Sequence, residues 1–142
     1  MPAPELLAAP ALAFMGVALA DGSLEKAEAG RFRRQLACGG EYGELFTEVL
    51  DALSASDRTL DAAVEGASVA AVSGPDALEE ALARVKTALD RDHPAHAARF
   101  AEDLLSFARG IAEAAAGLYD TGPKVSDVEQ AVLDRIAGAV GV

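Results

Sequence analysis

Apolar side chains recur at the spacing of an α-helix along almost the whole chain. The clearest example is a stripe formed by Leu78, Leu82, Val85 and Leu89. Residues three or four positions apart lie on one face of a helix, so this stripe predicts a helix with one buried face. No segment shows the sustained alternation of apolar and polar residues that marks a half-buried strand. The pattern therefore predicts an all-α fold.

Turn-forming residues divide this pattern into about seven helices, which we expect to form a single-domain bundle over residues 1–142. The breaks fall near residues 21–23, 39–40, 54–57, 73–76, 92–94 and 120–122. The first helix is expected over 5–20 and the second to end near 37. The others carry their apolar residues within 45–53, 60–71, 78–89, 100–118 and 128–140. The sixth has the longest stripe, and we expect it at the centre of the bundle.

Two of these helices begin with residues that are typical of helix caps. Ser56 or Asp57 can cap the fourth helix through a side-chain oxygen. Asp76 followed by Glu79 resembles a capping box at the start of the fifth.

The first segment, residues 6–20, is almost free of charge and resembles a secretory signal. However, the first basic residue is Lys26, and Glu5 stands where a signal peptide carries positive charge. The segment is also too short and too rich in alanine for a membrane span. We expect a buried first helix of a protein that is not itself transmembrane, with a cleaved signal as the alternative.

Composition narrows the classes of partner. Hydrophobic residues make up 51% of the chain and aromatic residues only 5%, so small aliphatic side chains must build the core. The net charge of -11 repels phosphate backbones, which argues against nucleic acid and favours cations or basic protein surfaces. The single cysteine, Cys38, rules out an internal disulfide framework and agrees with a reducing cytoplasm.

An acidic helix–loop–helix pattern occurs near both ends of the chain. In the first copy, an apolar helix is followed by Asp21, Gly22, Leu24 and then Glu28. Glu28 lies four residues from both Leu24 and Phe32, so it faces the protein or the edge of its core. A carboxylate in that position needs a partner, because desolvating an unpaired charge is costly.

The second copy contains Asp120, Gly122, Val125 and Glu129. Its alternative explanation is purely structural: Ser126 and Glu129 form a capping box. The first copy fits that explanation poorly, because Glu25 stands in the position of the cap. Capping therefore accounts for Glu129 better than for Glu28.

Neither copy is an EF-hand. Counting from Asp21, Lys26 stands where the calcium loop requires glycine, and Phe32 stands where it requires an acid. A cation site must therefore be assembled between the two copies, from Asp21, Glu28, Asp120 and Glu129. Clustered carboxylate oxygens suit a hard divalent ion such as Ca²⁺ or Mg²⁺.

In these residues the chain resembles the TerB-like family, the tellurite-resistance TerB domain. Ala20, Asp21, Gly22, Leu24 and Glu28 match its first motif, and Asp120, Gly122, Val125, Ser126 and Glu129 match its second. The second match departs from the family pattern at Tyr119 and Thr121. The resemblance implies a cytoplasmic helical domain with a divalent-cation site, linked to tellurite and stress resistance at the membrane.

Other candidate chemistry is sparse. His93 and His96 could share a helix face and bind zinc. Pro94 between them is more typical of a helix start, which would place both histidines in its exposed first turn. Arg31, Arg33 and Arg34 form a basic cluster that could pair with a neighbouring acid.

The sequence contains no phosphate-binding loop, dinucleotide motif or Ser–His–Asp arrangement, so we expect a non-enzymatic module. An enzyme with paired carboxylates and a structural or protein-interaction domain are the alternatives. A protein partner, a membrane-associated complex and a homodimer stay open.

Overall fold

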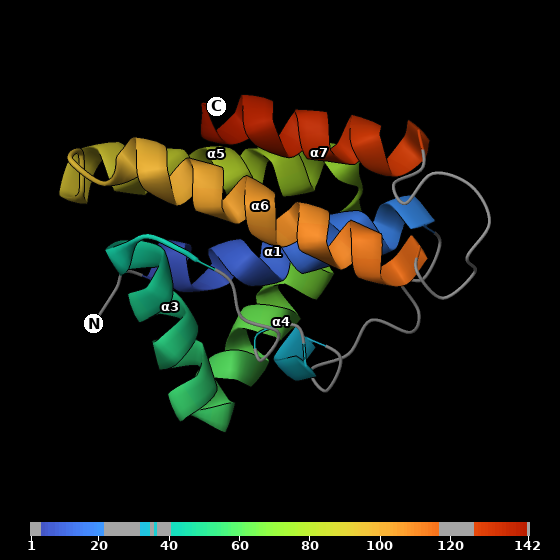
Figure 1. The fold of residues 1–142 in the computed structure, drawn as a ribbon. Helices are drawn as coiled ribbons and strands as arrows, with labels where there is room; N and C mark the ends of the chain where they lie inside the picture. The colour runs from blue at the N-terminus through green and yellow to red at the C-terminus, as the bar shows by residue number, and fades with distance from the viewer. Residues whose placement is uncertain (1–3, 22–31, 35, 37–40, 117–126, 142) are drawn as a thin grey trace.

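The computed structural model describes residues 4–21, 32–34, 36, 41–116 and 127–141, and the bundle is all-α (Figure 1). No described residue lies in a strand. The helices are α1 (Pro4–Asp21), α3 (Glu44–Ala55), α4 (Asp57–Ser73), α5 (Pro75–Asp92), α6 (Ala97–Ala116) and α7 (Asp127–Val140). Residues 32–34 and 36, between α1 and α3, are also helical. The predicted fold class is confirmed.

Helix α1 lies at the centre of the bundle, where it contacts α3, α4, α5, α6 and α7 (Figure 1). Every residue from 9 to 18 is buried. Ten consecutive residues cover all directions around a helix, so this part of α1 is enclosed on every side. The prediction that the sixth helix is central is therefore wrong. That helix is α6, and a face bearing Glu102, Ser106 and Arg109 is exposed.

Helix α7 packs against α1 where a small side chain is needed. A Cβ atom placed on Gly16 of α1 would lie 3.6 Å from Val132 Cγ1 and 3.9 Å from Ile136 Cδ1. The two side chains of α7 thus rest directly on the surface that Gly16 leaves open.

All five phenylalanines of the chain belong to one connected group of rings in the core. Phe32 joins Phe14 of α1 to Phe107 of α6, with ring centroids 5.5 and 6.5 Å apart. Phe46 of α3 continues the group to Phe107 at 5.8 Å and Phe100 at 5.2 Å. These few large rings fill the space that the many alanines cannot.

Of the two helix caps predicted from the sequence, one is confirmed and the other is wrong. Ser56 caps α4, where its Oγ accepts a hydrogen bond from the Thr59 N–H at 3.3 Å. At the start of α5 the capping residue is Gly74, at a φ of 118° that favours glycine, so the cap predicted at Asp76 is wrong. Asp76 and Glu79 instead each accept a hydrogen bond from Arg135 of α7 at 3.0 Å.

Candidate functional site

The end of α1 and the start of α7 lie at the same end of the bundle (Figure 1). The two helices run in opposite directions, and Gly16 is level with the stretch between Val132 and Ile136. Helices rise about 1.5 Å per residue, so the backbones of Asp21 and Glu129 both lie about 7.5 Å beyond this contact. The end of α1, which carries Asp21, and the start of α7, which carries Glu129, therefore lie at the same level along the bundle.

The other predicted ligands fall outside this description. Glu28 and Asp120, with the flanking Glu25, lie outside the described residues, as do the side chains of Asp21 and Glu129. The proposed grouping of these acids therefore stays a prediction. Within the described part of the chain, no group of three or more His, Cys, Asp or Glu residues could hold a metal ion.

The histidine pair lies in the turn between α5 and α6. His93 is half-buried and ends α5, and His96 is exposed one residue before α6 begins. The prediction that both lie in the first turn of a helix is therefore wrong. The neighbouring Arg91 donates two hydrogen bonds to Asp92. These bonds raise the pKa of Arg91 and lower the pKa of Asp92.

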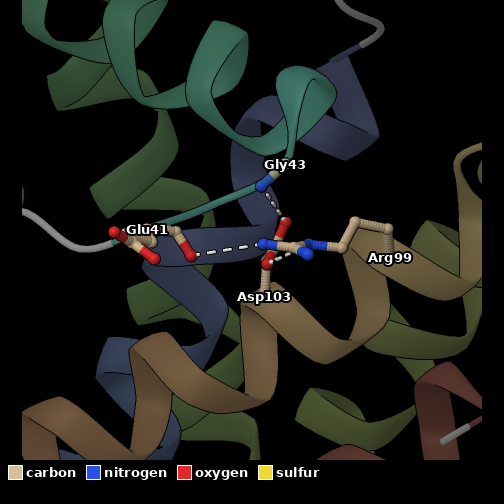
Figure 2. A network of polar contacts seen from close by, with 4 residues as sticks. All are labelled: Glu41, Gly43, Arg99 and Asp103. Carbon is tan, nitrogen blue, oxygen red and sulfur yellow. Dashed lines mark hydrogen bonds and ion pairs between the residues drawn. The ribbon is translucent and has the colours of Figure 1, made fainter.

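One polar site was missed from the sequence: Asp103, the buried charged residue of α6 (Figure 2). Its Oδ2 accepts a hydrogen bond from the Gly43 N–H at 2.7 Å, and its Oδ1 accepts one from Arg99 Nε at 2.9 Å. Arg99 also donates to the carbonyl oxygen of Glu41 at 3.3 Å. Asp103 therefore fixes the start of α3 to α6, using an N–H that the helix itself leaves unpaired.

Gly43 is needed for this contact. A Cβ atom there would lie 2.6 Å from Arg99 Cγ and 3.0 Å from Asp103 Oδ2. The signal for the site was present in the sequence, because Asp103 lies three residues after Phe100 and four before Phe107 on the apolar face of the helix. Glu28 has a similar place in the sequence, four residues from both Leu24 and Phe32.

A shallow apolar groove crosses α1, α4 and α5. It consists of two hollows of about 330 and 310 Å³ that share Ala8 and Gly66. The first lies between α1 and the first half of α4, and the second extends to Ala81 and Val85 of α5. Val69 and Val72, on the second half of α4, are exposed by 64% and 77%.

The basic cluster has one identified partner: Arg33 forms an ion pair with Asp57 at the start of α4. Both side chains are largely exposed, so the pair adds little to stability. Arg34 is exposed, and Arg31 lies outside the described residues together with Cys38.

Comparison with known proteins found no matching family model, no similar curated protein and no similar solved structure. Among the described helices, none is both long enough and apolar enough to cross a membrane.

Proposed function

We propose that the chain is a non-enzymatic, TerB-like helical module that binds a divalent cation, Ca²⁺ or Mg²⁺. Asp21, Glu28, Asp120 and Glu129 are its proposed ligands. The observation that supports this most is the antiparallel arrangement of α1 and α7, in which the end of α1 and the start of α7 lie at the same end of the bundle. The helix that carries Asp21 of the first motif therefore ends in the region where the helix that carries Glu129 of the second begins. About a hundred residues separate the two motifs along the chain.

The chemistry of the motifs supports the same proposal. Carboxylate oxygens are the ligands that Ca²⁺ and Mg²⁺ prefer. Acids that crowd together repel one another, and a divalent ion removes that repulsion. The resemblance to the TerB-like family extends the proposal to tellurite and stress resistance in the cytoplasm.

Thermal unfolding in EDTA, Ca²⁺, Mg²⁺ and Mn²⁺ tests the proposal. An ion present at ~100 times its Kd stabilises the folded state by about 2.7 kcal/mol, which raises the melting temperature visibly. We expect Glu28→Gln to abolish this shift. The matched control is Glu48→Gln, on the exposed side of α3, which should respond as the wild type does. Equal melting temperatures in EDTA and in every ion would reject the cation site.

The second candidate is a protein-interaction domain whose motif acids only cap helices and form salt bridges. The observations that favour it are the apolar groove over α1, α4 and α5 and the exposure of Val69 and Val72 on α4. Exposed apolar surfaces and apolar grooves are typical of sites that bind other proteins. This candidate predicts that no ion changes the melting temperature while a partner still binds.

A further inference from the structure

We draw no further inference here: the strongest candidate, the apolar groove over α1, α4 and α5, has charged lining residues of both signs, Glu5, Arg58 and Arg84, and nothing in the structure shows what covers it.

Discussion

Helices α1 and α6 are similar in length, 18 and 20 residues, but they bury themselves in different ways. α1 is apolar on all sides, and every residue from 9 to 18 is buried. α6 buries one face and exposes the other, with Glu102 and Ser106 among its exposed residues. A helix with one clear apolar stripe therefore lies on the outside of the core and buries that face. A helix that is apolar all round is the one that the other helices surround.

The comparison extends to polar groups. In the part of α1 from residue 9 to 18 there is no charged side chain at all. The buried face of α6 includes Asp103, which is 4% exposed and bound by Gly43 and Arg99. A helix at the edge of the core can bury a charge because its neighbours and the solvent provide partners, whereas a helix at the centre cannot.

The largest expected effect comes from placing a charge in α1. Ala13 is fully buried, so Ala13→Asp must desolvate a carboxylate without a partner and should cost about 4 kcal/mol or more. That loss approaches the whole stability of a typical domain. On the exposed face of α6, Ser106→Asp should change stability by less than about 0.5 kcal/mol. Urea unfolding followed by circular dichroism measures both, and similar losses would contradict the central position of α1.

A matched pair of glycines gives the next effect. Gly16→Leu forces extra atoms against Val132 and Ile136 and should cost about 2–3 kcal/mol. Gly110→Leu on α6 has nothing within 4 Å and should stabilise the protein by about 0.5–1 kcal/mol, because leucine is a better helix former. Equal changes in the two melting temperatures would mean that α7 does not pack on Gly16.

The smallest of the three effects concerns the buried charge of α6. Asp103→Ala leaves the Gly43 N–H without its acceptor and should cost about 1–2 kcal/mol, because Arg99 is half exposed and regains water. Glu102→Ala, the exposed neighbour on the same helix, should stay within about 0.5 kcal/mol of the wild type. Hydrogen exchange of the amides at the start of α3 should accelerate in Asp103→Ala alone. Unchanged exchange there would show that Asp103 does not fix α3.

The sequence predicted the fold well because helical periodicity and turn residues are local. Ser56 illustrates this, since a cap depends only on the residues that follow it. The partners of Asp76 and Glu79 were missed because Arg135 lies more than fifty residues away in the chain. The partner of Asp103 was missed for the same reason, because Gly43 lies 60 residues away, although the position of Asp103 on an apolar helix face is visible in the sequence. The central position of α1 was not predicted, because the helix with the longest apolar stripe was expected at the centre of the bundle.

The candidate cation site could be predicted only as far as its residue types and its spacing. The sequence suggested that two acidic motifs meet, and the antiparallel arrangement of α1 and α7 is compatible with that meeting. The apolar groove had no sequence signal of its own. Its small residues are also good helix formers, and their spacing does not distinguish an open groove from a close helix contact.

The central position of α1 also matters during protein synthesis. α1 precedes all the other helices of the bundle, so it leaves the ribosome before any segment that will enclose it. At a translation rate of roughly 5–20 residues per second, α7 follows after about 6–24 seconds. During that interval a helix with no polar side is exposed. The nascent chain therefore depends on rapid pairing of α1 with α4 and α5, or on a chaperone, to avoid aggregation.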